Sequence, residues 1–315
     1  MSLVVVGSVA LDTVETPFGR ADAVLGGSGS YFSAAASLFH PVRLVGVIGD
    51  DFPVAELDFL RARGVDLDGL ERAAGPSFHW VGRYDFDLNT AHTIDTRLGV
   101  FADFAPVLPE AYRDAEWVFL ANIDPDLQLD VLEQVAAPRF VACDTMNYWI
   151  QGKKDALLRL LERIDIVLLN DAEIRQLTGK ANLLRAARDV MERGPRAVVV
   201  KKGEHGAMLF TPEGVFFVPG FPLETVFDPT GAGDSFAGGF LGYLAAGGTV
   251  DIHHLRRAMV YGSAMGSFAV ERFSAGRLKD LTIAEVHARV RDFRTMTHFE
   301  LAEPVAESPG TAPPA

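Results

Sequence analysis

The chain has 315 residues, of which 49% are hydrophobic and 23% charged, a composition typical of a globular protein with one large domain or two ordinary ones. Its formal net charge of −13 argues against nucleic acid as a partner, because nucleic-acid-binding proteins usually present a basic surface. The N-terminal residues lack the basic segment of a signal peptide, and no apolar run is long enough to span a membrane. The single cysteine, Cys143, excludes an internal disulfide and a cysteine-based zinc site, and it is compatible with a cytoplasmic location.

Short apolar segments alternate with helix-like segments along the chain, and this alternation predicts an α/β fold. The apolar segments contain few polar residues, as expected for parallel strands that are covered on both faces. Helices are expected between them, for example at 153–163 and 183–193. The predicted strands are 3–6, 42–48, 117–121, 140–143, 166–169 and 197–201.

Residues 78–88 follow a different pattern, in which apolar and polar side chains alternate. This period of two predicts a half-exposed strand. We expect this strand in a small accessory sheet or lid, and the alternative is an edge strand of the main sheet. The side chains expected on its apolar face are Phe78, Trp80, Tyr84, Phe86 and Leu88.

The strongest local motif is TVFDPTGAGDSFAGGF at residues 225–240. A short strand is expected to end near Asp228, followed by a turn at 231–233 and a helix that begins near Asp234. Glycines allow the N–H groups of such a turn to point into one space, and the helix N-terminus adds partial positive charge, so the turn can bind phosphate oxygens. Asp234 would then be placed to accept a proton from an attacking hydroxyl. The alternative is a tight turn followed by an ordinary first-turn acidic residue.

The segment 228–240 resembles the C-terminal signature of the ribokinase, or PfkB, family of carbohydrate and nucleoside kinases, and the resemblance extends over about residues 1–296. It implies that Gly231, Ala232 and Gly233 form an anion hole for the transferring phosphoryl group. It also implies that Asp234 is the catalytic base that activates the acceptor hydroxyl.

The resemblance further implies a ribokinase-like, three-layer α/β/α core with a mostly parallel central sheet and a small β-sheet lid. Residues 1–300 are expected to form the kinase domain, with lid segments inserted at about 13–27 and 78–105. Residues 301–315 are rich in Pro, Ala and Glu and are expected to be a disordered tail. A homodimer formed through the lid is a further expectation.

Two other segments match positions that bind the acceptor in this family. Asp12 follows the first predicted strand, and a carboxylate can accept hydrogen bonds from two neighbouring hydroxyls. A plain strand-ending turn is the alternative. Gly26 and Gly27 correspond to a Gly-Gly pair that hinges the lid and touches the substrate. Relatives usually carry Asn a few residues later, where this chain has Tyr31 and Phe32, and this departure suggests an acceptor with a flatter or more apolar part.

Asn170 and Glu173 follow a predicted strand and resemble the family's Asn-x-x-Glu motif. The resemblance places Asn170 beside the phosphates of ATP and Glu173 beside Mg²⁺. The same spacing is that of a helix capping box, and both interpretations can hold together.

Residues 200–209 predict two strands joined by a glycine-containing turn. The resemblance implies that Lys201, Gly203 and Gly206 border the nucleotide, and a plain hairpin is the alternative. The stretch 262–276 corresponds to the region that wraps the adenine and often a monovalent cation such as K⁺.

The implied reaction is ATP-dependent phosphorylation of a hydroxyl of a small sugar. The segment from Asp144 to Trp149 lacks the Arg that sugar kinases of the family often carry there, which favours an uncharged acceptor. A nucleoside is a close alternative, since Trp80, Tyr84 and Phe86 could stack on a base. A catalytically silent nucleotide- or sugar-binding protein is a rival that an intact Asp234 argues against. No Walker motif occurs and no GxGxxG follows the first strand, which argues against a Walker-type ATPase and a dehydrogenase.

Overall fold

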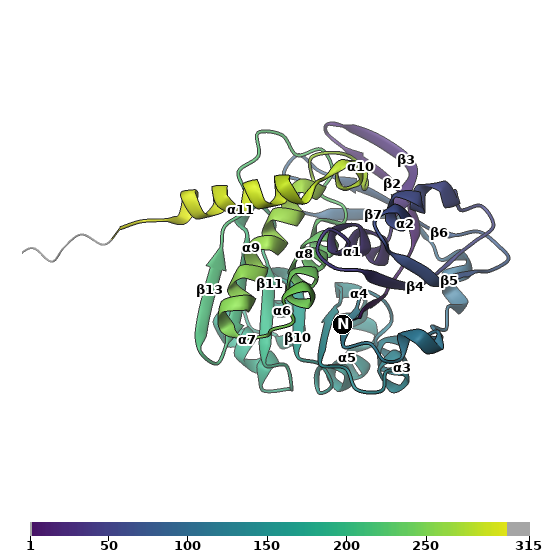
Figure 1. Ribbon diagram of the computed structural model, residues 1–315. Coiled ribbons are helices and arrows are strands. Elements are labelled where there is room, and N and C mark those ends of the chain that lie inside the picture. The colour runs from purple at the N-terminus through teal and green to yellow at the C-terminus, as the bar shows by residue number, and fades with distance from the viewer. Residues whose placement is uncertain (1, 301–315) are drawn as a thin grey trace, which may run out of the picture.

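A nine-stranded sheet lies at the centre of the computed structural model, which describes residues 2–300 (Figure 1). The tail expected at 301–315 lies outside the described residues. The strands of this sheet are β1 (Leu3–Val6), β4 (Val42–Ile48), β5 (Asp66–Arg72), β8 (Trp117–Leu120), β9 (Phe140–Asp144), β10 (Ile166–Asn170), β11 (Ala197–Lys201), β12 (Ala207–Thr211) and β13 (Gly214–Val218).

The strand order is β13-β12-β11-β10-β9-β8-β1-β4-β5, and every pair from β11 to β5 is parallel. β12 and β13 continue the sheet in antiparallel fashion. Each of the predicted strands is present, with ends that differ from the prediction by one residue at most. A mostly parallel sheet is therefore confirmed, and its carboxyl ends meet along one edge.

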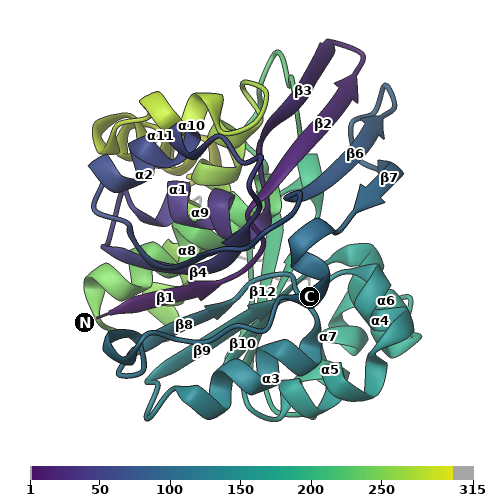
Figure 2. The same ribbon diagram turned by 90° about the vertical axis from the view of Figure 1, so that its right-hand side faces the viewer.

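Helices cover both faces of the main sheet, as Figure 2 shows. Alternate residues of β1 contact the two layers: Leu3 and Val5 pack with α1, α8 and α9, whereas Val4 and Val6 pack with α3, α5, α6 and α7. The helices are α1 (Ser28–Ala36), α2 (Asp58–Ala62), α3 (Pro125–Gln134), α4 (Asn147–Gly152), α5 (Lys154–Leu161), α6 (Asp171–Thr178), α7 (Leu183–Met191), α8 (Ala232–Gly247), α9 (Ile252–Ala269), α10 (Gly276–Asp280) and α11 (Ile283–Thr297). Short 3₁₀ turns are η1 (Val54–Leu57), η2 (Gly99–Asp103), η3 (Glu110–Tyr112) and η4 (Gly203–His205).

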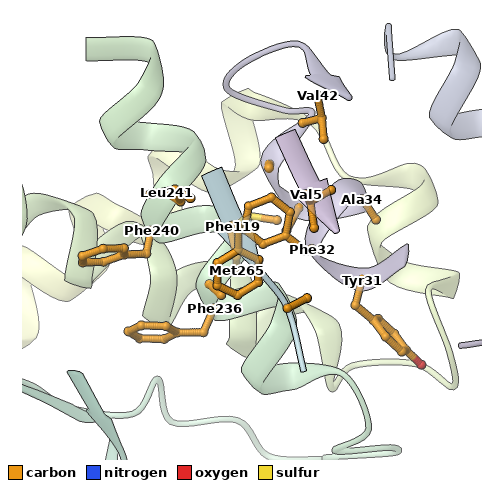
Figure 3. Packing of buried hydrophobic residues seen from close by; sticks show 14 of the residues in the cluster. Val5, Tyr31, Phe32, Ala34, Val42, Phe119, Phe236, Phe240, Leu241 and Met265 are labelled. Carbon is orange, nitrogen blue, oxygen red and sulfur yellow. The ribbon is translucent and has the colours of Figure 1, made fainter. Parts of the chain in front are cut away.

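The close packing of α1 against α8 fixes two helix N-termini relative to each other. A Cβ on Gly238 of α8 would lie 2.4 Å from the carbonyl oxygen of Phe32 in α1, so this contact requires glycine. The ring of Phe32 stacks on Phe119 of β8 at 4.3 Å between centroids. Figure 3 shows these rings together with Phe236 and Phe240 of α8. The first turns of both helices are thereby held on one side of the core.

A second, four-stranded sheet stands apart from the main one (Figure 2). Its order is β3-β2-β6-β7, with β2 and β6 parallel and both outer pairs antiparallel. The expectation that the period-two strand lies in a small accessory sheet is confirmed. The strands are β2 (Ala10–Thr16), β3 (Gly19–Gly26), β6 (Phe78–Tyr84) and β7 (Ala91–Arg97).

Two local predictions about strand ends are wrong. The period-two strand ends at Tyr84, because a turn follows in which the Leu88 N–H bonds to the carbonyl of Asp85. Phe86 is consequently 85% exposed rather than part of the apolar face. The strand expected to end near residue 228 is a loop, whose Phe227 N–H bonds to the carbonyl of Val270. Within residues 2–300, no helix has the length and hydrophobicity needed to cross a membrane.

Candidate active site

The carboxyl ends of three neighbouring parallel strands bring polar side chains together. Asn170 at the end of β10 pairs in register with Lys201 at the end of β11. Asp144 at the end of β9 pairs with Leu168, two residues before Asn170. This edge of an open parallel sheet is where ligands usually bind in α/β proteins.

The glycine turn at the start of α8 faces this edge. Gly231 is the N-cap residue and has a φ of 75°, a left-handed conformation that favours glycine. The helix begins at Ala232, so Ala232 and Gly233 belong to its first turn, earlier than the predicted start near Asp234. The first N–H groups of a helix lack intrahelical acceptors and carry partial positive charge, so this turn can bind an anion.

Asp234 lies in the first turn of α8 and is half-buried. Burial, followed by the charge of Asp144, raises the pKa of Asp234 to about 7, although Lys201 and its own N–H oppose the rise. A carboxylate with a pKa near neutrality can take up a proton and release it again. The structure thus places a candidate base directly beside the anion-binding turn.

Lys201 forms an ion pair that sequence reasoning missed. Its Nζ donates to Oδ2 of Asp144 at 2.7 Å, and Oδ1 of Asp144 accepts from the N–H of Thr145. The same Nζ lies 3.1 Å from the position that a Cβ on Gly233 would occupy. Burial alone would lower the pKa of Lys201, but Asp144, Glu173 and Asp234 raise it above its ordinary value. A protonated ammonium therefore lies beside the turn, supplied by β11, two strands away in the sheet from Asp144, rather than by an Arg that follows Asp144.

Asp12 and Gly26 lie in the second sheet, and Gly27, the N-cap residue of α1, follows directly; their role in acceptor binding stays a prediction. The carboxylate of Asp12 lies over Gly26, where a Cβ would be 2.0 Å from Oδ2. Gly27 has a φ of 93° and donates its N–H to Asp12. Burial, together with the charges of Asp228 and Asp234, raises the pKa of Asp12 to about 8. The carboxylates of Asp12 and Asp234 are thus close enough to influence each other.

The capping box of Asn170 and Glu173 is formed. The Asn170 side chain accepts from the Glu173 N–H at 2.8 Å, and the Asn170 N–H donates to Oε2 of Glu173 at 2.6 Å. Burial raises the pKa of Glu173 to about 7, with Lys201 lowering it and Asp144 raising it. Among residues 2–300, no group of three His, Cys, Asp or Glu side chains could hold a metal ion. The roles of Asn170 in nucleotide binding and of Glu173 in metal binding stay predictions.

The backbone structure alone explains why residues 203 and 206 are glycines. Both have positive φ values, 54° and 88°, in the turn between the antiparallel strands β11 and β12. A Cβ on Gly206 would lie 2.1 Å from the carbonyl oxygen of Val218. Asn89, in the loop between β6 and β7, donates to Glu204 of this turn at 3.3 Å. Their contact with a nucleotide stays a prediction.

The second sheet also contacts the loop that precedes the anion turn. Thr230 donates from its hydroxyl to Oη of Tyr84 in β6 at 3.2 Å, and Thr16 of β2 donates to the carbonyl of Phe227 at 2.9 Å. Asp228 accepts N–H bonds from Thr230 and Ser274, which joins this loop to the stretch 262–276. Sequence spacing gives no signal for these contacts, and adenine or cation binding by 262–276 stays a prediction.

The raised pKa of Asp12 predicts a pH-dependent cost in stability. The folded protein keeps a proton on Asp12 that the unfolded chain releases above about pH 4. The wild type therefore loses stability as pH rises from about 4 to about 8, and Asp12→Asn does not share this loss. In urea unfolding, the free energy of unfolding of Asp12→Asn should exceed that of the wild type by a few kcal/mol at about pH 8.5. The two values should be equal near pH 4.

Asp22→Asn, an exposed change on the neighbouring strand, is the control and should give no gain at high pH. A difference between Asp12→Asn and the wild type that does not change with pH would contradict the buried, protonated carboxyl.

Known proteins share both the sequence pattern and the fold of this chain. Residues 2–281 match the family described as pfkB family carbohydrate kinase. A cytidine kinase of Thermococcus kodakarensis is 32% identical over 254 residues, which cover 78% of this chain and 90% of that relative. The nucleoside kinase of Methanocaldococcus jannaschii has a TM-score of 0.74 at 21% identity, covering 93% of this chain and 99% of that one. An E. coli protein assigned as a ribokinase II and solved with ATP and Mg²⁺ has a TM-score of 0.76 at 20% identity, covering 92% of this chain and 99% of that one. The chain therefore belongs to the pfkB family of carbohydrate kinases, the family that the motif at 228–240 indicated.

Proposed function

We propose that the protein transfers the γ-phosphoryl group of ATP, bound with Mg²⁺, to a hydroxyl of a nucleoside. The observation that carries the reaction is the position of Asp234, beside the glycine turn at the N-terminus of α8 and with a pKa raised to about 7. From there it takes the proton of the attacking hydroxyl. The amides of 231–233 and the ammonium of Lys201 stabilise the charge on the transferring phosphoryl group.

The acceptor and the nucleotide bind on opposite sides of this turn. Asp12 accepts hydrogen bonds from hydroxyls of the acceptor, with Gly26 leaving room for its carboxylate. Asn170 and the turn between β11 and β12 border the phosphates of ATP. The contact of Tyr84 with Thr230 supports a lid that closes the acceptor side and excludes water.

Glu173 is the carboxylate that we assign to Mg²⁺. Proteins usually hold Mg²⁺ through one or two carboxylates together with substrate phosphates and water, so a single buried Glu fits this ion. The ion would neutralise charge on the phosphates. A monovalent cation and a homodimer through the lid stay predictions.

Trp80 supports a nucleoside as the acceptor. It pairs in register with Asp12 between the parallel strands β6 and β2, so the two side chains point to the same face. Its ring lies over Gly82, where a Cβ would be 1.9 Å from the indole, and Nε1 donates to Thr93. This half-buried aromatic plane beside Asp12 is suited to stack on a base.

The other aromatic candidates for base stacking are placed less well. Tyr84 is buried and bonded to Thr230, and Phe86 lies beyond the strand end. The relative from Thermococcus kodakarensis, a cytidine kinase, also supports a nucleoside. A small sugar, which the sequence alone slightly favoured, is the second candidate.

Asp234→Asn tests the reaction. The change removes the charge and most of the basicity but keeps the shape, so we expect turnover to fall by about 10² to 10⁴ while the fold and ATP binding persist. Turnover is measured as ADP release with a panel of nucleosides and sugars, and ATP binding by titration. Asp251→Asn is the control, because Asp251 also lies at the start of a helix, as the N-cap residue of α9, and is outside the site. Near-normal turnover of Asp234→Asn would remove it from the mechanism, and a wild type without turnover would favour the silent binding protein.

Trp80→Ala tests the acceptor class. Stacking on an aromatic side chain contributes about 1–3 kcal/mol per base, so KM for the nucleoside should rise roughly 5- to 150-fold. A free sugar has no base, and its KM should stay unchanged. Phe86→Ala, the exposed aromatic after the same strand, should leave both values unchanged. Equal effects of Trp80→Ala on nucleoside and sugar would contradict base stacking.

A further inference from the structure

The indole of Trp80 occupies space that a glycine in its own strand leaves free. Gly82 is buried, and a Cβ there would lie 1.9 Å from Cη2 of the indole and 2.3 Å from Cζ2. Any larger residue at position 82 would therefore displace the ring. The six-membered end of the indole thus lies over Gly82, so the side chain of Trp80 extends along β6 toward Tyr84.

A β-bulge in the adjacent strand brings a hydroxyl to this indole. The register of β6 with β7 shifts between Val81 and Gly82, so that Gly82 lies opposite Thr93 and Ile94 is skipped. Without the shift, Ile94 would lie opposite Gly82, because side chains alternate strictly between the two faces of a regular strand. Bulges commonly change the direction of a side chain in this way. Here the bulge places Thr93 next to the ring of Trp80.

Thr93 forms a hydrogen bond with the indole. Nε1 of Trp80 donates to Oγ1 of Thr93 at 3.1 Å. The ring is thus fixed at both ends, by the space over Gly82 and by this bond. Thr93 is exposed and Trp80 is half-buried, so water could replace the hydroxyl as the acceptor, and the bond contributes little to the stability of the fold. Its main consequence is the orientation of the indole.

The fixed indole lies on the face of the second sheet that looks toward the glycine turn. Trp80 pairs with Asp12 in register between parallel strands, so both side chains are on one face. Tyr84 is on the same face of β6 and bonds to Thr230, next to Gly231. The accessible part of the indole is therefore available to a molecule bound between Asp12 and the turn.

We propose that Thr93 is a positioning residue, whose hydroxyl holds the indole of Trp80 in the orientation that stacks on the base of the acceptor. This role rests on the nucleoside function proposed above. An aromatic plane that is already fixed loses less conformational freedom when a base binds, so the bond increases affinity without touching the reacting atoms. Gly82 contributes by leaving room for the ring. Because Thr93 acts through Trp80, its effect extends only to acceptors that carry a base.

The test compares wild type with two variants at position 93. Thr93→Val keeps the shape and the β-branch but removes the acceptor of the hydrogen bond, and Thr93→Ser retains it. For Thr93→Val we expect KM for the nucleoside to rise about 2- to 10-fold, with kcat, KM for ATP and KM for a free sugar unchanged. Thr93→Ser should keep KM near the wild-type value.

Thr96→Val is the matched control. Thr96 is an exposed threonine of the same strand, and it lies directly opposite Trp80, but the indole extends away from it toward Thr93. The control should leave every kinetic constant unchanged.

Two further measurements show whether Thr93 acts through the indole. The chain has three tryptophans, so the NMR resonance of the Trp80 indole N–H is assigned by its loss in Trp80→Ala. This resonance should shift in Thr93→Val and stay near its wild-type position in Thr93→Ser. In the Trp80→Ala background, Thr93→Val should not raise KM for the nucleoside any further, because the group that it positions is gone.

Several outcomes would overturn the proposal. If Trp80→Ala raises KM for the nucleoside and Thr93→Val does not, the positioning role is wrong and the stacking assignment stands. Equal rises for nucleoside and free sugar, or a further rise on adding Thr93→Val to Trp80→Ala, would show a general effect on the second sheet. If Trp80→Ala has no effect specific to nucleosides, or if the wild type phosphorylates none, the nucleoside assignment fails and the role of Thr93 fails with it.

Discussion

The removal of carboxylates from water is the constraint on which this site depends. Asp12, Asp144 and Glu173 are buried, Asp234 is half-buried, and their charges interact across one small volume. Burial of a carboxylate disfavours its charged form, and nearby negative charge adds to the effect. Lys201 offsets part of this cost through its ion pair with Asp144. The raised pKa values of Asp12, Glu173 and Asp234 decrease stability but provide groups that can exchange protons near neutral pH, a compromise that is common at active sites.

The backbone determines where these groups meet. The parallel sheet delivers Asp144, Asn170 and Lys201 to one edge through its register. Helix α8 adds Asp234 and an N-terminus with free N–H groups, and its packing on α1 fixes the turn at Gly231. The second sheet brings Asp12 from the other side and bonds to Thr230 through Tyr84, so this sheet and the glycine turn at Gly231 are mechanically connected.

Much of the fold could be predicted because buried parallel strands are mostly apolar. β1, β4 and β8 to β11 are apolar apart from Arg43 near the start of β4 and the polar residues that end β9, β10 and β11. β5 was not predicted because it is polar, with charged residues at Asp66, Asp68, Glu71 and Arg72. The capping box was predictable because its partners are three residues apart. Lys201 and Asp144 are 57 residues apart, and Tyr84 and Thr230 are 146 apart, so these pairs meet only through tertiary structure. Motifs thus identified Asp12, Asp234 and Lys201, but not the ion pair of Lys201 with Asp144 or the contact of Tyr84 with Thr230.

The pH dependence of kcat/KM for the acceptor tests the central claim most directly. If a buried carboxylate with a pKa near 7 must lose its proton before the acceptor hydroxyl can be activated, activity should fall tenfold per pH unit on the acidic side, with an apparent pKa near 7. The measurement is made on the wild-type protein at saturating ATP and Mg²⁺. A profile that stays flat down to about pH 5 would show a base with an ordinary carboxylate pKa and would contradict the account.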